Sequence, residues 1–114
     1  MESIKHKLKS QFRELYPSSN MSDRMETYMV LHHFGSYCAQ NFGNDKSKSI
    51  LKLINDVYQQ KSLFENNAIE NEFFYAIASQ LGNNDLLVHL NSIPKNLWSV
   101  YIKVLVQTQI NKEQ

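Results

Sequence analysis

The chain has 114 residues, of which 42% are hydrophobic and 20% charged, and its net charge is +1. This length and composition indicate one globular domain over residues 1–114 and exclude a disordered chain. The balanced charge argues against direct nucleic-acid binding, and the absence of an apolar run near 20 residues argues against a membrane span, so we expect a cytoplasmic protein.

Apolar side chains predict a first helix over residues 2–15. Ile4, Leu8 and Phe12 recur at steps of four, which places them on one helical face with the lysines opposite. Pro17 and the polar residues after it should end this helix.

The second and third helices are predicted on either side of a short break at residues 43 and 44. Ser22 is a good N-cap for the second helix. Asp45 is expected to cap the third, which has the clearest helical periodicity in the chain. Its apolar stripe consists of Ile50, Leu51, Ile54, Val57 and Tyr58.

Three further helices follow. The fourth should begin at Ser62 or Asn66 and end at Leu81, where a glycine follows as a C-cap. A short fifth helix is expected over residues 85–90, and Pro94 suits the first turn of the sixth. The fourth helix should bury Ile69, Phe73, Ala76, Ile77 and Leu81, with Phe74 and Ala78 widening that face.

These patterns predict an all-α fold of five or six helices in one compact array. Only three glycines and two prolines interrupt the pattern, which argues against a turn-rich β fold. Short connections permit either an irregular bundle or a HEAT-like stack of helical hairpins. We expect the bundle, because so short a solenoid has few units over which to spread its core.

Histidine and cysteine give no pattern typical of catalysis or metal binding. His32 and His33 are adjacent, so their side chains point about 100° apart on a helix and cannot chelate one metal as an i, i+4 pair could. Cys38 is the one cysteine and lies among apolar residues, away from a histidine base. We therefore expect no metal, no cofactor and no enzymatic activity.

Four acidic residues form the second group of candidates: Asp56, Glu65, Glu70 and Glu72. Three of them cluster at the start of the fourth helix, with Asp56 across the preceding turn. Three roles are open to these carboxylates: stabilisation of the helix start, contact with a basic partner, and acid–base chemistry. Stabilisation of the helix start is favoured, and contact with a partner is the second choice.

Two aromatic residues, Tyr75 and Trp98, fall beside the best apolar stripes rather than on them. Most aromatics in so small a chain belong to the core. Tyrosine and tryptophan on a surface are, however, typical anchors of protein interfaces. Both are therefore candidates for contact with a partner.

One stretch resembles a known family. Ile50-Leu51-Lys52-Leu53-Ile54-Asn55 and Asn67-Ala68-Ile69-Glu70-Asn71-Glu72-Phe73-Phe74 resemble a small all-helical bacterial family of immunity proteins in polymorphic-toxin and contact-dependent growth inhibition systems. The second motif of that family resembles N-x-I-x-x-x-F-L-E, and Phe73-Phe74-Tyr75 stands here where Phe-Leu-Glu is expected. The similarity covers about half of the chain.

The resemblance implies an immunity protein that forms a heterodimer with a cognate toxin domain and covers its active site. Such toxins are often nucleases or ribonucleases with basic clefts, so Asp56, Glu65, Glu70 and Glu72 could replace phosphates. Two alternatives remain. One is a helical adaptor or regulatory module that binds a protein or peptide, and the other is a small enzyme whose site combines His32, Glu70 and Tyr101.

Overall fold

The computed structural model describes residues 3–18, 22–82 and 86–113, and the side chains to residue 111. Helices account for 83% of this part of the chain, which contains no strand, so the all-α prediction is confirmed. The α-helices are α1 (Ile4–Gln11), α2 (Asp23–Gln40), α3 (Asp45–Tyr58), α4 (Leu63–Ala68), α5 (Tyr75–Leu81), α6 (Leu86–Asn91) and α7 (Trp98–Glu113). Three other segments complete the list: the 3₁₀ turns η1 (Arg13–Leu15) and η3 (Lys95–Leu97), and the π-helical η2 (Ile69–Phe74).

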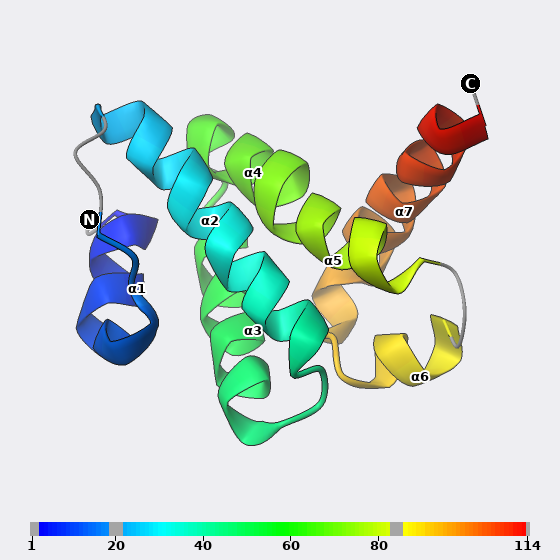
Figure 1. Cartoon of the computed structure of the whole chain (residues 1–114), viewed down its shortest axis with the longest axis horizontal. Helices are drawn as coiled ribbons and strands as arrows, with labels where there is room; N and C mark the ends of the chain where they lie inside the picture. The colour runs from blue at the N-terminus through cyan, green and yellow to red at the C-terminus, as the bar shows by residue number, and fades with distance from the viewer. Residues whose placement is uncertain (1–2, 19–21, 83–85, 114) are drawn as a thin grey trace.

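The centre of the bundle is a pair of long helical segments. α4, η2 and α5 follow one another without a break, and α2 packs along η2 and α5 (Figure 1). α1 packs on α2 and α3 at one end, while α7 packs on η2 and α5 at the other. The extents of 34 × 32 × 25 Å are those of a compact bundle.

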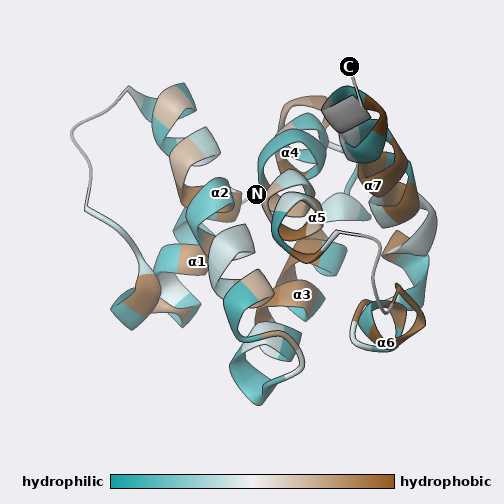
Figure 2. Ribbon diagram, turned by 45° about the vertical axis from the view of Figure 1, so that its right-hand side comes forward, coloured by the Kyte–Doolittle hydropathy of each residue, from teal (hydrophilic) through white to brown (hydrophobic). Residues whose placement is uncertain are grey.

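The predicted apolar stripes face the interior of this bundle. Ile50, Ile54 and Val57 of α3 are buried, as the 3.6-residue periodicity predicts. The hydropathy-coloured ribbon shows the same alternation of apolar and polar residues along α2 and α3 (Figure 2). The largest fully buried side chains are those of Tyr101, Phe34, Phe73, Phe74, Ile4, Leu8, Leu31, Ile50, Leu51, Ile54, Ile69 and Ile77.

Side-chain caps fix where the helices begin. The Ser22 hydroxyl accepts a hydrogen bond from the Met25 amide, which confirms the predicted N-cap of α2. The cap of α3 is Asn44, whose side chain accepts from the Ser47 amide at 2.8 Å, and not Asp45 as predicted. Asp45 is instead the first helical residue, where its charge still favours the helix dipole.

The fourth predicted helix begins at Ser62, whose hydroxyl accepts from the Glu65 amide. It ends at Gly82, which has a φ of +65° and so takes the C-cap conformation that glycine adopts at low cost. The start of the predicted fifth helix at residue 85 lies outside the described residues.

The first predicted helix is shorter than expected. α1 ends at Gln11, because Phe12 leaves the helical region with φ −131° and ψ 50°, and a 3₁₀ turn follows. The break still leaves the Phe12 ring in the core, where it packs edge-on against Phe34 at a centroid distance of 6.1 Å. Burial of this ring therefore does not require a continuous helix.

Replacing Tyr101 with phenylalanine is expected to raise the free energy of unfolding by about 1–2 kcal/mol. Tyr101 is fully buried, and its hydroxyl has no hydrogen-bond partner among the described residues. An unpaired buried hydroxyl is destabilising, whereas the ring itself packs on Phe74 and would stay in place. Urea unfolding of both proteins measures the difference. A clear loss of stability in Tyr101→Phe would show that the hydroxyl is hydrogen-bonded after all.

Candidate functional site

The clearest candidate site is a cleft between α7 and the continuous helix formed by α4, η2 and α5. We call it the η2–α7 cleft. Its volume is about 260 Å³. Two predicted partner-binding residues, Glu70 and Tyr75, line it from one side. The full lining consists of Glu70, Asn71, Tyr75, Lys103, Val104, Gln107, Thr108 and Asn111.

The π-helical segment η2 shapes one wall of this cleft. A π turn adds a residue to the helical repeat, which changes the direction in which the following side chains point. Ile69, Phe73 and Phe74 are all fully buried, while Tyr75, the next residue, is 44% exposed at the cleft. Single π turns within α-helices occur frequently at functional sites.

Glu70 is held in a three-residue cluster that joins α3, η2 and α7. Its carboxylate accepts hydrogen bonds from the Tyr58 hydroxyl at 2.6 Å and from Lys103 Nζ at 2.8 Å. Burial alone would raise the pKa of Glu70, but the bonds from Lys103 and Tyr58 and the charge of Lys103 outweigh it and lower that pKa. The glutamate is therefore ionised at neutral pH and already paired within the chain.

Three of the other residues that line the cleft, Asn71, Gln107 and Asn111, carry side-chain amides. Asn71 is exposed on η2, and Gln107 donates a hydrogen bond of 3.3 Å to Asn111 across one turn of α7. Val104 and Thr108 supply less exposed surface from the same helix. Side-chain amides both donate and accept, so this lining suits the main chain or polar side chains of another molecule.

Glu65 and Trp98 have structural partners. The Glu65 carboxylate accepts from the Ile4 amide at 2.8 Å, so it satisfies an amide at the start of α1 that has no partner within the helix. Trp98 Nε1 donates to the carbonyl oxygens of Leu90 and Ile93, at 2.9 and 2.8 Å, and closes the turn between α6 and α7. Glu65 thus connects α4 to α1, and Trp98 connects the start of α7 to the end of α6.

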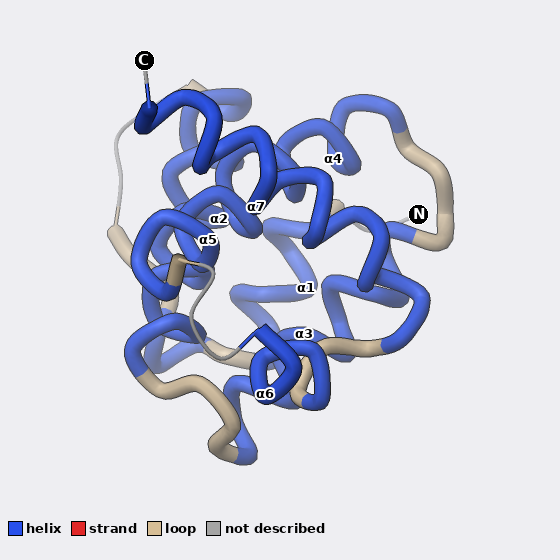
Figure 3. Tube along the Cα trace, turned by 90° about the vertical axis from the view of Figure 1, so that its right-hand side faces the viewer, coloured by secondary structure: helices blue, strands red, loops and turns tan. Residues whose placement is uncertain are grey.

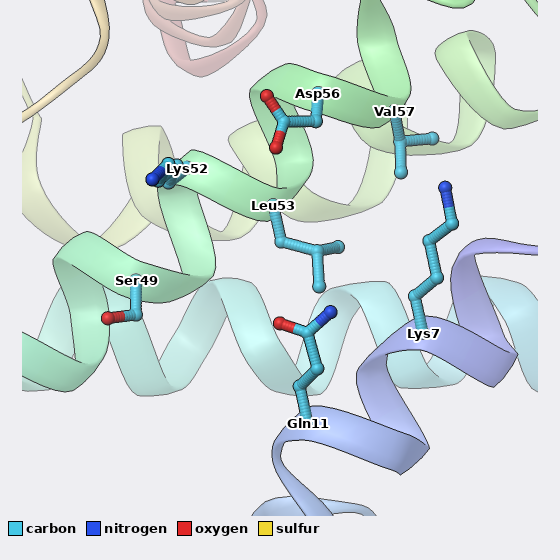
Figure 4. Close-up of a pocket in the computed structure, with 7 residues that line it drawn as sticks. All are labelled: Lys7, Gln11, Ser49, Lys52, Leu53, Asp56 and Val57. Atoms are coloured by element: carbon cyan, nitrogen blue, oxygen red, sulfur yellow. The ribbon is translucent and has the colours of Figure 1, made fainter.

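Glu72 and Asp56 lie apart from this cleft. Glu72 approaches exposed His32 with an Oε1–Nδ1 distance of 3.8 Å. Asp56 lines a second hollow of about 460 Å³ between α1 and α3, with Lys7 and Lys52 (Figure 4). The four acids therefore do not form the single cluster that their sequence positions suggest, because each carboxylate has a different set of neighbours.

The hollow between α1 and α3 is more polar than the η2–α7 cleft. Figure 4 shows Lys7 and Gln11 of α1 pointing across toward Leu53 and Val57 of α3. Lys7, Lys52 and Asp56 form no ion pair within the described part of the chain. The sequence pattern places the lysines of α1 opposite its apolar face, and no local pattern predicts that α3 lies across from Lys7.

The three residues of the proposed enzyme site, His32, Glu70 and Tyr101, do not contact one another through hydrogen bonds or ion pairs. His32 approaches Glu72, Glu70 binds Tyr58 and Lys103, and no hydrogen bond or ion pair links His32, Glu70 and Tyr101. Cys38 is fully buried, and burial raises the pKa of its thiol to about 12, so it is a poor nucleophile at neutral pH. Within the described ranges, no three His, Cys, Asp or Glu side chains are placed to hold a metal ion.

The remaining findings are the apolarity of the helices and the comparisons with known proteins. In the part that the structure describes, no helix combines the length and apolarity needed to cross a bilayer. No curated protein and no solved structure matches the chain. A family model does match residues 5–110, which is nearly the whole chain, and by this match the protein belongs to the family described as Domain of unknown function (DUF7674).

Proposed function

We propose that the protein binds a bacterial toxin domain and inhibits it by covering its active site, with the η2–α7 cleft as the docking surface. The observation that carries this proposal is the exposed Tyr75 ring at the edge of a cleft whose lining includes three side-chain amides. Tyrosine anchors many protein interfaces, because it contributes a large apolar ring and a hydroxyl at a low cost in side-chain entropy.

The size of the cleft supports a protein partner over a small molecule. Small-molecule sites usually enclose about 300–1,000 Å³, and this cleft of about 260 Å³ falls below that range. It can accept one or two side chains of a partner whose remaining contacts lie on the surrounding surface. The motif at residues 67–74, which resembles the immunity family, supplies Glu70 and Asn71 to the wall of this cleft.

The pairing of the acids changes the expected mode of docking. Replacement of phosphates by carboxylates needs free charges, but Glu65 and Glu70 are hydrogen-bonded within the chain. Glu72 and Asp56 are the acids left to attract a basic toxin surface, and they act by steering its approach. In this proposal Tyr75 and the amides supply the affinity.

A helical adaptor that binds peptides is the second candidate, and the amide lining of the cleft favours it. Side-chain amides can pair with the main chain of any extended peptide, whereas a toxin inhibitor recognises one folded surface. Binding to many unrelated peptides with similar affinity would support the adaptor over the inhibitor.

Tyr75→Ala is expected to weaken binding to the cognate toxin domain of this proposal by about 2 kcal/mol, or roughly thirtyfold. The substitution removes the exposed ring while the buried part of α5 stays intact. Isothermal titration of the purified pair measures the change. Leu63→Ala is the matched control, since Leu63 is a large exposed apolar residue at the start of the same continuous helix, away from the cleft.

Glu72→Lys tests the contribution of charge in the same titration. It is a cleaner reversal than Glu70→Lys, which would place a second cation beside Lys103 and disturb the fold. We expect weaker binding, with a larger loss of affinity at low salt than at high salt. If Tyr75→Ala binds as tightly as Leu63→Ala, the η2–α7 cleft is not the docking surface.

A further inference from the structure

The hollow between α1 and α3 has the volume of a small-molecule site. It encloses about 460 Å³, and pockets that bind small molecules usually enclose about 300–1,000 Å³. Leu53 and Val57 of α3 are buried, and their side chains are directed toward α1 (Figure 4). They give the hollow an apolar part, while the other residues that line it are polar or charged. An apolar surface with a few polar groups around it is the usual make-up of a ligand site.

Three charged side chains line this hollow, and none of them is paired. Lys7 of α1 and Lys52 and Asp56 of α3 form no ion pair and no side-chain hydrogen bond within the described part of the chain. Asp56 follows Lys52 by one helical turn, and the two still do not pair. Elsewhere the chain does pair its lysines with carboxylates, as in the ion pair of Lys46 with Glu14. All three charges at the hollow are therefore available to a ligand.

The signs of these charges restrict the ligand. Two ammonium groups at one hollow repel each other, and an anionic ligand would relieve that repulsion. Asp56, however, would repel a plain polyanion such as phosphate. The electrostatic complement is a molecule with two anionic groups and one cationic group. Gln11 and Ser49 add an amide and a hydroxyl, which can donate to a carboxylate or accept from an ammonium group.

We propose that the hollow binds an acidic amino acid, glutamate or aspartate, as a free small molecule. Its two carboxylates pair with Lys7 and Lys52, and its ammonium group pairs with Asp56. Its methylene groups lie against Leu53 and Val57. Each group of the ligand then meets a group of opposite charge or of like polarity.

The inference does not rest on the proposed function. None of the seven residues that line the hollow lines the η2–α7 cleft. α1 and α7 lie at opposite ends of the molecule in Figure 1, so α7 is at the front of Figure 3 and α1 is behind it. A ligand in the hollow therefore leaves the cleft and Tyr75 free.

The exposure of the charged groups sets the expected affinity. Lys52 and Asp56 are exposed, and Lys7 is partly buried. Exposed ion pairs are screened by water and strengthen binding only a few-fold each. We therefore expect a Kd of about 1 mM at low ionic strength, rising with added salt.

Amide NMR spectra of the isotope-labelled protein, recorded during titration with L-glutamate and L-aspartate, test the site. The shifts should saturate with one or both amino acids, and the largest should fall on the amides of α1 and α3 around Gln11 and Leu53. The amides of Tyr75 and Gln107 should not move, because they belong to the other site. No saturable shift by about 10 mM of either amino acid, ten times the expected Kd, would overturn the proposal. Shifts centred on the η2–α7 cleft would overturn it as well.

Three further compounds test the match of charges at equal ionic strength. Glutarate lacks the ammonium group of glutamate, γ-aminobutyrate lacks one carboxylate, and inorganic phosphate is a plain anion. Each should bind about threefold or more weakly than the better of the two amino acids. Equal or tighter binding of glutarate or phosphate would show a general anion site and overturn the acidic amino acid as the ligand.

Two variants assign the charges, with Lys48→Met as the matched control. Lys52→Met should raise the Kd about three- to fivefold, whereas Lys48, an exposed lysine of the same helix outside the hollow, should be replaceable without effect. Asp56→Asn should abolish the preference for glutamate over glutarate, a change that a loss of fold would not produce. Both side chains are exposed, so each variant should keep the circular dichroism spectrum and Tm of the parent. A Lys52→Met protein that binds like Lys48→Met, or an unchanged preference in Asp56→Asn, would overturn the assignment.

Discussion

Gly35→Ala is expected to lower the free energy of unfolding by about 2–3 kcal/mol, although alanine is the better helix former. A Cβ at Gly35 would lie 2.4 Å from the carbonyl oxygen of Phe73 and 3.0 Å from the Cβ of Ala76. Alanine gains about 1 kcal/mol in helix propensity. The clash outweighs this gain, because the atom met is backbone of the π segment and cannot rotate away.

Urea unfolding of Gly35→Ala measures this loss. Gln40→Ala is a suitable control, since Gln40 is an exposed residue of the same helix α2. Any shift of η2 that relieves the clash would also displace the wall of the η2–α7 cleft, so Gly35→Ala should weaken partner binding as well. A variant as stable as the parent would show that α2 and η2 do not pack this closely.

Phe74→Ala is expected to cost about 3–5 kcal/mol of stability, the range measured for removal of large buried rings. Phe74 is fully buried, and its ring lies edge-on to Phe73 at 5.3 Å and to Tyr101 at 5.7 Å. The ring therefore packs between η2 and α7, and its removal leaves a cavity between these two segments. A typical domain of this kind is stable by about 5–15 kcal/mol, so the variant could be partly unfolded at room temperature.

Phe74→Leu provides the graded comparison. Leucine fills much of the volume, so we expect a loss well below that of Phe74→Ala. Chemical unfolding with two probes, far-UV circular dichroism and Trp98 fluorescence, would follow both helix content and the start of α7. A loss under about 1 kcal/mol in Phe74→Ala would contradict the placement of this ring in the core.

The sequence patterns predict the helices well because helix formation depends on local information. The periodicity of Ile50, Ile54 and Val57 identified the buried face of α3, and Ser22 and Gly82 marked the ends of their helices. The π segment was not predicted. Its side chains are compatible with an ordinary α-helix, and the close packing of Gly35 on Phe73 is a contact between distant parts of the chain.

The candidate site was predicted only in part, for a related reason. Glu70 and Tyr75 were singled out, and the structure brings both to one cleft. Lys103 and Gln107 were missed, because a polar residue on a helix face has no distinguishing signal until the element opposite it is known. The role of Glu65 was likewise hidden, since its partner, the amide of Ile4, is 61 residues away in sequence.

We propose that the protein acts by one-to-one binding and performs no chemistry itself. The measurement that bears on this proposal is a titration of the activity of the proposed cognate toxin domain with increasing amounts of this protein. Occlusion predicts that activity falls in proportion to the protein added and vanishes at one equivalent, and that Tyr75→Ala requires an excess. Complete inactivation by a small fraction of an equivalent, or undiminished toxin activity at a large excess, would contradict the account.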